Sequence, residues 1–352
     1  MRQPDLSIII PTLNEAKTLP LLVADLAGQK GIDLEVIVSD GGSTDSTAEI
    51  AKTILADKDL PGTCLVGPAG RGRQLNAGAA AAIADWLLFL HADSRLPDHS
   101  QLQHALHDIQ GQQERTGTDT TAGRFALRFE REPVDDSFAL FYYESKARLG
   151  RAGCIHGDQG MLFRKTFFAK VGPFREDLPV MEDTALAEQV RKHGKWLLLP
   201  GEIITSARRF AIEGWGARQT LNALMMNFLA IGWLDFFVKA PEIYRQQDKT
   251  KPLQLGPFYR QIMELLASMS WQKRWSLWFA TGTYVRGQAW QIGLALDCRK
   301  AYQRNLAYPQ DSGAWLRGFD RWFEPLTNHR VGCFITAFLV RLWFAAQLRR
   351  RS

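Results

Sequence analysis

Three clusters of polar residues each follow a short apolar run within the first hundred residues. They are Pro11-Thr12-Leu13-Asn14-Glu15, Asp40-Gly41-Gly42-Ser43-Thr44-Asp45 and His91-Ala92-Asp93. Their carboxylates, hydroxyls and imidazole can form hydrogen bonds, and a carboxylate can also take a proton or bind a hard cation. Three such clusters point to one shared ligand site.

Two further groups of polar residues come later in the chain. Residues 157–160 place Asp158 and Gln159 between two glycines, which allow close approach of the backbone to a ligand. Glu182 and Asp183 form an acid pair, and a carboxylate within reach of a hydroxyl can act as a general base. Structural interpretations stay open, because the acid pair also suits the first turn of a helix and residues 157–160 also suit a turn.

The elements that must position these groups alternate between strands and helices. The sequence predicts strands at 6–10, 34–39 and 86–90 and helices at 15–28, 43–56 and 73–84. This alternation indicates βαβ units and a mostly parallel sheet, in which a ligand crevice lies outside the carboxyl ends of the strands. The polar segment 110–121 is predicted to be a loop. Asp40 and Asp45 could instead serve as caps for the helix that follows them.

The ordered motifs resemble those of a known enzyme family. They lie at 11–15, 40–47, 70–78, 88–97, 157–164 and 181–183. In order and spacing they are similar to the motifs of family 2 glycosyltransferases over about residues 5–210. The residue sequences of 90–97 (Leu-His-Ala-Asp-Ser-Arg-Leu-Pro) and 157–160 are most similar to those of a bacterial arsenosugar-biosynthesis-type subgroup of this family. The resemblance implies a GT-A fold, which is Rossmann-like α/β with a mostly parallel sheet flanked by helices.

The same resemblance implies a nucleotide-diphosphate sugar as donor. Asp40 would accept a hydrogen bond from the base, and Arg71 would be the basic contact to the nucleotide. The first cluster would line the same pocket through Pro11, Thr12, Asn14 and Glu15.

The resemblance also implies a divalent metal, Mg²⁺ or Mn²⁺. His91-Ala92-Asp93 stands where the family has an Asp-x-Asp metal motif, so Asp93 keeps a carboxylate ligand for a cation that bridges diphosphate oxygens. His91 replaces the first Asp and is expected to face the ribose. A histidine after a strand can equally be structural.

The catalytic roles follow from the same family pattern. Asp183 would be the base of an inverting transfer to an unknown acceptor, and Glu182 would help to orient the site. Asp158 and Gln159 would bind acceptor hydroxyls. Arg208 and Arg209 could stabilise the diphosphate, and their alternative role is a basic surface.

Charge divides the 352 residues into two halves, for which we predict domains at 1–205 and 206–352. Residues 206–352 hold 21 Lys and Arg against 9 Asp and Glu, and 9 of the 11 Trp; residues 1–205 hold 22 against 28. The second half reads as helical. It suits a peripheral membrane platform or a soluble bundle with Trp in its core. For the apolar stretch at 331–348, an interfacial or packed helix is favoured over a membrane span, because Arg341 in its middle is costly in a bilayer core. Basic and aromatic composition alone does not specify a nucleic-acid partner.

Composition sets the remaining expectations. Four widely spaced cysteines predict neither a metal cluster nor a disulfide framework and suit a reducing cytoplasm. Within it, the membrane platform would place the second half at the inner membrane face. The apolar run before Pro11 is too short for a signal peptide. Two alternatives to transfer stay open: a nucleotidyltransferase on a similar fold, and a nucleotide-sugar-binding scaffold without catalysis, suggested by His91.

Overall fold

The computed structural model describes residues 3–58, 60–131, 137–248, 250–308 and 313–351, and the chain forms two compact units. The first unit comprises Met1–Val134 and Ala147–Ser206, and the second comprises Asp135–Lys146 and Ala207–Ser352. The division at residue 206 lies next to the change in charge and tryptophan content. The second unit also takes most of helix α5 (Phe138–Ala147), which no feature of the sequence indicated.

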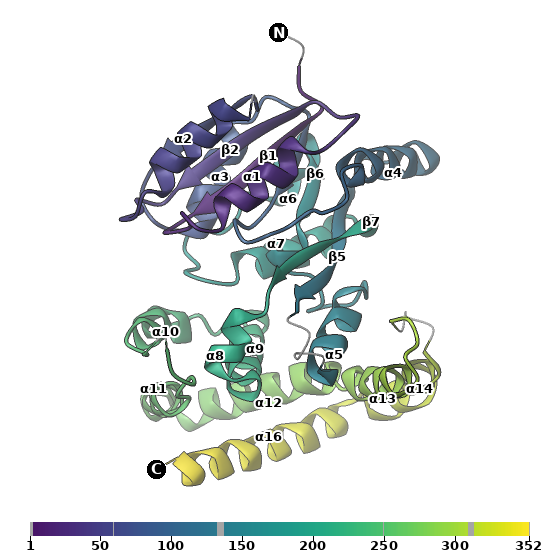
Figure 1. The fold of residues 1–352 in the computed structure, drawn as a ribbon. Helices are drawn as coiled ribbons and strands as arrows, with labels where there is room; N and C mark the ends of the chain where they lie inside the picture. The colour runs from purple at the N-terminus through teal and green to yellow at the C-terminus, as the bar shows by residue number, and fades with distance from the viewer. Residues whose placement is uncertain (1–2, 59, 132–136, 249, 309–312, 352) are drawn as a thin grey trace. The chain divides into compact units, whose positions relative to one another are not determined.

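The first unit is built on a seven-stranded sheet with the order β3-β2-β1-β4-β6-β5-β7 (Figure 1). The strands are β1 (Leu6–Thr12), β2 (Leu34–Asp40), β3 (Gly62–Val66), β4 (Trp86–Phe89), β5 (Thr121–Glu130), β6 (Met161–Arg164) and β7 (Lys195–Ser206). Neighbours run parallel except β6, which is antiparallel to both β4 and β5. The predicted α/β fold with a mostly parallel sheet is therefore confirmed.

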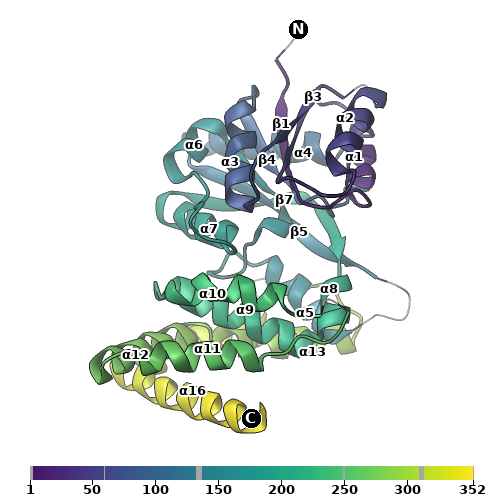
Figure 2. The ribbon, with the colours of Figure 1, turned by 90° about the vertical axis from the view of Figure 1, so that its left-hand side faces the viewer.

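Helices cover both faces of this sheet. They are α1 (Leu19–Ala27), α2 (Thr47–Asp57), α3 (Arg71–Ala81), α4 (Gln101–Thr116), α6 (Lys165–Val171) and α7 (Glu182–His193). Residues of α1, α2 and α4 share one apolar cluster with the sheet, and residues of α3, α6 and α7 share another. Figure 2 shows these two sets of helices on opposite sides of the strands.

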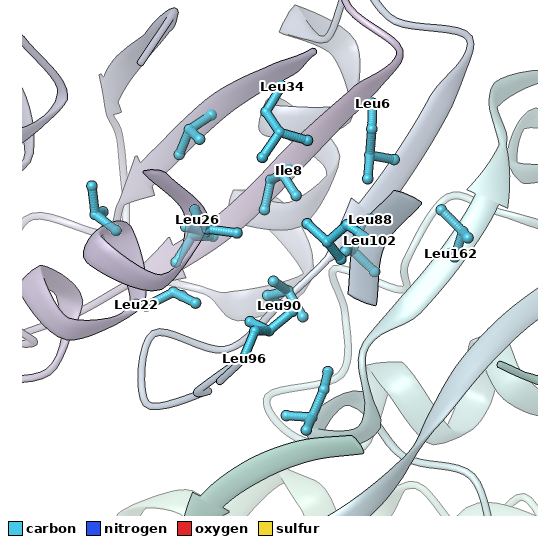
Figure 3. Packing of buried hydrophobic residues seen from close by; sticks show 14 of the residues in the cluster. Leu6, Ile8, Leu22, Leu26, Leu34, Leu88, Leu90, Leu96, Leu102 and Leu162 are labelled. Carbon is cyan, nitrogen blue, oxygen red and sulfur yellow. The ribbon is translucent and has the colours of Figure 1, made fainter. Parts of the chain in front are cut away.

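Strand β1 shows how the sequence fills both layers. It is buried along its whole length, as is usual for an almost continuously apolar strand inside a parallel sheet. Ile8 and Ile10 enter one cluster and Ile9 enters the other, because successive side chains point to opposite faces. Figure 3 shows Leu22 and Leu26 of α1 pointing into the cluster that contains Ile8.

The predicted strands are confirmed to within two residues, but one predicted loop is wrong. Segment 110–121 continues helix α4 as far as Thr116 and then enters β5 at Thr121. The helix continues because Ile109 and Gln113, four residues apart, both face the interior, while most of the polar residues between and after them lie on the outer side. Helices α1 and α2 begin later than predicted, since the residues before Leu19 and Thr47 form loops.

The second unit is helical, as the sequence predicted. Besides α5 it contains α8 (Arg208–Glu213), α9 (Trp215–Ala230), α10 (Asp235–Arg245), α11 (Gly256–Ala267), α12 (Trp271–Gly287), α13 (Trp290–Gln303), α14 (Ala314–Gly318), a π-helical turn at Phe319–Phe323, α15 (Glu324–Thr327) and α16 (Arg330–Arg351). Aromatic side chains form much of its interior, for example Phe228 against Trp233 and Phe236 with ring centroids 4.6 and 4.9 Å apart. Among the described residues, one helix is long and apolar enough to cross a membrane by length and composition, at Arg330–Arg349 with a mean hydropathy of 1.7.

Candidate functional site

The loops that follow β1 and β2 are joined by side-chain hydrogen bonds. Strands β1 and β2 are parallel, and their last residues, Thr12 and Asp40, are paired, so both strands end at the same edge of the sheet. Beyond that edge, the side-chain Oδ1 of Asn14 accepts from the Thr44 N–H at 2.8 Å, and the Ser43 hydroxyl accepts from the Asn14 backbone N–H at 2.8 Å. Asn14 adopts a positive φ of 60°, which asparagine tolerates better than most residues. The two polar clusters, residues 11–15 and 40–45, thus form one preorganised surface at the edge of the sheet, which we call the rim.

Asp40 lies at the centre of this rim and is almost fully buried. Its Oδ2 accepts from the N–H groups of Gly42 and Ser43 at 3.0 and 2.8 Å, and its Oδ1 accepts from the hydroxyls of Thr12 and Ser43 at 3.1 and 2.5 Å. A carboxylate offers about four acceptor sites. The protein itself therefore occupies the hydrogen-bonding capacity of Asp40, and its first effect is to fix the turn after β2.

The other members of these two clusters have distinct positions. Pro11 is a buried residue of β1, opposite Ser39 in the sheet. Glu15 is half-buried, and its Oε2 accepts from the Thr18 hydroxyl at 2.6 Å. Asp45 precedes the N-cap of α2, which is Ser46, and its Oδ1 accepts from the N–H of Thr47, the first residue of that helix, at 3.0 Å.

Helix α3 links this rim to the acidic residues of the site. Gln74 is buried, and its amide donates to the carbonyl oxygens of Thr12 and Ser39, both at 2.8 Å. One helical turn earlier, the Arg71 guanidinium forms an ion pair with Glu182 at the start of α7. Helix α3 can lie this close to β1 because residue 78 is glycine: a Cβ there would fall 2.4 Å from Cγ2 of Ile9. The first turn of α3 therefore fixes both halves of the site.

Glu182 and Asp183 are buried side by side at the N-terminus of α7, but their acidities differ. Burial raises the pKa of Glu182 despite the positive charge of Arg71. Burial also opposes ionisation of Asp183, yet Arg71, His156 and the N–H of Gly157 outweigh it and lower the pKa of Asp183 to about 2. Asp183 is consequently ionised throughout the neutral range. The same two acids raise the pKa of Arg71 above its usual value, although burial of the guanidinium works in the opposite direction.

Asp183 is held in place by backbone donors. Its Oδ2 accepts from the Gly157 N–H at 2.7 Å, and its Oδ1 accepts from the Thr184 N–H at 2.6 Å. Gly157 also lies against His91: a Cβ at residue 157 would fall 2.8 Å from Nε2 of His91 and 3.0 Å from Oδ2 of Asp183. Only glycine leaves room for the imidazole and the carboxylate together. His91, Gly157 and Asp183 therefore meet although they are far apart in sequence.

Asp158 brings a further carboxylate to the same place. Burial, together with the negative charges of Asp183 and Asp93, raises the pKa of Asp158 to about 7, and Arg71 only partly offsets this. Its Oδ1 is buried and has no hydrogen-bond partner within the described residues. Asp158 of the short 3₁₀ turn at Gly157–Gln159 and the two acids of α7 thus lie around the Arg71 guanidinium, and Asp93, which follows β4, lies on the side of Asp158. Of the three strand-end clusters predicted to share one site, those at 11–15 and 40–45 are joined directly, and the cluster at 91–93 meets Gly157, Asp158 and Asp183.

The donor set suits a hard divalent cation that arrives together with phosphate. No three side chains of the ligand-forming types gather closely enough to enclose a metal ion in the part of the chain that the structure describes. Mg²⁺ seldom requires such a cage, because it commonly binds one or two carboxylates together with substrate phosphates and water. Asp93 and the unpartnered Oδ1 of Asp158 match that requirement.

Comparison with known proteins decides the family. The profile of glycosyl transferase family 2 matches residues 7–172. A PGL/p-HBAD biosynthesis glycosyltransferase of Mycobacterium tuberculosis is 31% identical over 191 residues, which cover 52% of this chain and 68% of that protein. This chain belongs to glycosyltransferase family 2. A 4,4'-diaponeurosporenoate glycosyltransferase of Staphylococcus haemolyticus is 34% identical over 115 residues, 31% of this chain and 30% of that protein.

Solved structures resemble this glycosyltransferase more distantly. A mannosyltransferase from Pyrobaculum calidifontis, in complex with GDP-Man and Mn²⁺, is 18% identical with a TM-score of 0.49 and covers 97% of this chain and 88% of its own. TarS 1–349 of S. aureus in complex with UDP is 15% identical with a TM-score of 0.44, covering 86% and 93%.

Family membership revises two expectations. The related sequences support the family and not the predicted arsenosugar subgroup, since their descriptions name PGL/p-HBAD and 4,4'-diaponeurosporenoate. The chain is a glycosyltransferase enzyme, and the nucleotidyltransferase and non-catalytic scaffold alternatives are set aside.

In this glycosyltransferase, Gln159 does not have the position predicted for an acceptor-binding residue. Its side chain is fully buried, and its amide donates to the carbonyl oxygens of Ala147 and Cys154, both at 3.0 Å. Gln159 therefore points into the protein and holds the segment that leads into residues 157–160. The prediction of a direct contact with acceptor hydroxyls is corrected, because the donor atoms of the side chain are already used inside the fold.

Arg208 and Arg209 begin helix α8, which belongs to the second unit. Both side chains are exposed. The site of the first unit is built without them, and their role toward a diphosphate stays a prediction.

Three positioning residues were not singled out from the sequence. His156 contributes to the low pKa of Asp183, and its Nδ1 lies 3.1 Å from the Thr184 hydroxyl. Arg124, buried in β5, donates to the backbone carbonyl oxygens of residues 147–149 and so supports the same loop as Gln159. Gln74 lies inside the 70–78 motif, and a buried polar residue in the middle of a recognised motif is the signal that could have drawn attention to it.

Proposed function

We propose that this enzyme transfers a sugar from a nucleotide-diphosphate donor to an acceptor hydroxyl with inversion at the anomeric carbon. The observation that carries the proposal is the ionised Asp183, held by the Gly157 N–H beside Arg71, Asp93 and Asp158. A single displacement needs a base on the acceptor side and charge stabilisation on the leaving-group side. This cluster offers both within one site.

The bond changes follow from that arrangement. The acceptor oxygen forms a bond to the anomeric carbon while the bond between that carbon and the diphosphate oxygen breaks. The proton of the acceptor hydroxyl passes to Asp183, and the nucleoside diphosphate leaves with the electron pair of the broken bond. Oδ2 of Asp183 accepts one hydrogen bond from Gly157 and has a second lone pair for the hydroxyl.

A pKa of about 2 makes Asp183 a weak base before the donor binds. Arg71 is the positive group that contributes most to this low pKa, and it acts on both Glu182 and Asp183. A diphosphate placed near Arg71 competes for the same positive charge, so it raises the basicity of Asp183. Donor binding therefore prepares the base for the acceptor.

Asp93 and Asp158 would hold the divalent cation that the family uses. When bound, that cation neutralises charge on the diphosphate leaving group. Asp158 is thereby reassigned from acceptor binding to the cation, because its unpartnered oxygen is buried next to the charge of Asp93. The rim fixed by Asn14, Asp40 and Gln74 would receive the base and ribose as a preformed pocket.

A thermal-shift screen of UDP-, GDP- and dTDP-sugars with and without Mn²⁺ tests this function. We expect one nucleotide class to raise the melting temperature, with a larger shift when Mn²⁺ is present. Release of nucleoside diphosphate from that donor is then measured with water or a cell extract as acceptor. An enzyme that binds none of these donors contradicts the proposal.

A further inference from the structure

Helix α16 exposes an apolar stripe on the side that faces away from its own unit. Six large apolar residues repeat at helical spacing, and each is more than half exposed. They are Val331, Phe334, Ile335, Phe338, Leu339 and Leu342. We call these six residues the α16 stripe. Figures 1 and 2 both show α16 at the edge of the second unit, with α12 beside it.

The opposite face of α16 is already packed against its unit. Cys333, Ala337 and Phe344 are buried there. The contact with α12 is close, because a Cβ on Gly282 would lie 2.5 Å from the Ala337 backbone nitrogen. The ring of Phe344 lies 5.7 Å from that of Trp278. Since this face packs against its own unit, α16 is held along α12 and is not free to cross a bilayer on its own.

Helix α12 extends the apolar surface with aromatic residues. Trp271, Trp275 and Phe279 follow one another at four-residue intervals and are all exposed. The ring of Trp275 stacks on Phe334 of the α16 stripe with centroids 6.4 Å apart and an angle of 8°. Phe279 borders the same hollow as Phe334. The two helices therefore present one continuous surface.

The two helices that present this surface carry charges of one sign. Helices α12 and α16 contain eight Lys and Arg and no Asp or Glu, and seven of the eight remain once Arg286, which is buried and paired with Glu324 of α15, is set apart. Lys273 and Arg274 are exposed in the first turn of α12, and Arg330 lies exposed at the start of α16. Arg341 extends over the Trp275 ring at 5.3 Å, so its apolar stem and its charge share the surface with an aromatic residue. Aromatic and apolar residues edged by cations are the composition of interfacial membrane-binding helices.

We propose that the α16 stripe, with the aromatic row of α12, docks on the surface of a bilayer that contains anionic lipids. The helix lies in the plane of the interface, with the stripe among the upper acyl chains. Its basic residues contact phosphate head groups. A second copy of the chain would bury the apolar stripe equally well, but it would bring the like charges of two basic surfaces together. The charge therefore favours the anionic bilayer.

Vesicle flotation of the full chain tests the proposal. Vesicles of phosphatidylcholine alone are compared with vesicles that contain about one third phosphatidylglycerol, at low and high salt. The variant is Phe338→Gln/Leu342→Gln, which keeps good helix formers at exposed positions and so leaves folding intact. The matched control is Leu21→Gln/Val238→Gln, which removes two comparably exposed apolar residues from α1 and α10.

We expect the wild type to float with the anionic vesicles, and salt to weaken its binding. Partitioning of the stripe variant should fall about tenfold or more, whereas the control should bind like the wild type. A second variant, Lys273→Gln/Arg330→Gln, should lose about tenfold or more on anionic vesicles only.

Three results would overturn the proposal: no flotation of the wild type, equal binding of the stripe variant, or equal binding to neutral and anionic vesicles. Light scattering supplies the other check, since a dimer that the stripe variant converts to a monomer would assign the surface to a second copy. The nucleotide-induced thermal shift reports on the first unit, so loss of vesicle binding with that shift intact leaves the proposed function standing.

Discussion

Replacing Asp183 by Asn tests both the chemistry and the electrostatics of the site. The amide is nearly isosteric with the carboxylate but cannot take a proton from the acceptor. A positioned general base contributes about 10²- to 10⁴-fold to the rate. We therefore expect Asp183→Asn to lower the turnover of the donor by about that factor, with nucleotide binding retained.

The same substitution has a calculable effect on stability. The shift of the Asp183 pKa from its usual 3.8 to about 2 corresponds to about 2 to 3 kcal/mol of stabilisation. Because the folded-state pKa is the lower one, this stabilisation is fully present above about pH 4 and is lost as pH falls through about 2. Wild type should thus melt roughly 5–10 °C above Asp183→Asn at pH 7, and this gap should narrow markedly by pH 3.

The assays are release of nucleoside diphosphate from the donor and thermal unfolding at pH 7, 4 and 3. Glu188→Gln is the matched control, since Glu188 lies on the same helix with its side chain 40% exposed and should change neither measurement. Turnover of Asp183→Asn within threefold of the wild type would refute the assignment of the base. A melting gap that stays constant from pH 7 to pH 3 would refute the electrostatic argument.

Three further predictions concern the groups around Asp183. Arg71→Met should destabilise the fold by about 3–5 kcal/mol, because it leaves Glu182 buried without its partner, and Arg71→Met/Glu182→Gln should recover part of that loss in thermal unfolding. Asp158→Asn should weaken binding of Mn²⁺ in the presence of the nucleotide, measured by calorimetry, while nucleotide binding without metal should persist or improve. Gln74→Ala should cost about 2 kcal/mol in thermal unfolding, because two buried carbonyl oxygens lose their donor, whereas an alanine at the exposed Gln110 should be neutral.

The sequence located the site better than it assigned the side chains. Short apolar strands, each followed by polar residues, suffice to predict that residues 11–15, 40–45 and 91–93 share one edge of the sheet, because parallel strands end together. The direction of each side chain is a different matter. Asp40 and Gln159 look like ligand-binding residues in the sequence, yet both bind the backbone of their own fold. The hydrogen-bond partners of these two side chains are set by tertiary packing, and the local sequence pattern does not reveal them.

The missed elements have equally physical reasons. Strand β7 contains Pro200 and Gly201 in its middle, two residues that normally argue against a strand, and many of its residues are exposed. Strand β3 is an edge strand, and its residues are partly or fully exposed, so the apolar run that marks a buried strand is weak there. Pairing with neighbours from elsewhere in the chain stabilises both strands, and this information is non-local.

The charge balance of the site explains why cation and donor should bind together. Asp158, Glu182 and Asp183 lie around the guanidinium of Arg71, and Asp93 adds a further carboxylate next to Asp158, so these negative charges are only partly compensated. A diphosphate adds further negative charge to this place, which Coulomb repulsion disfavours in a partly buried site. A divalent cation between the carboxylates and the phosphates removes that repulsion for both partners. Each should therefore raise the affinity of the other, as reciprocal linkage requires. A donor that binds equally well with and without Mn²⁺ would show instead that Arg71 alone balances the site.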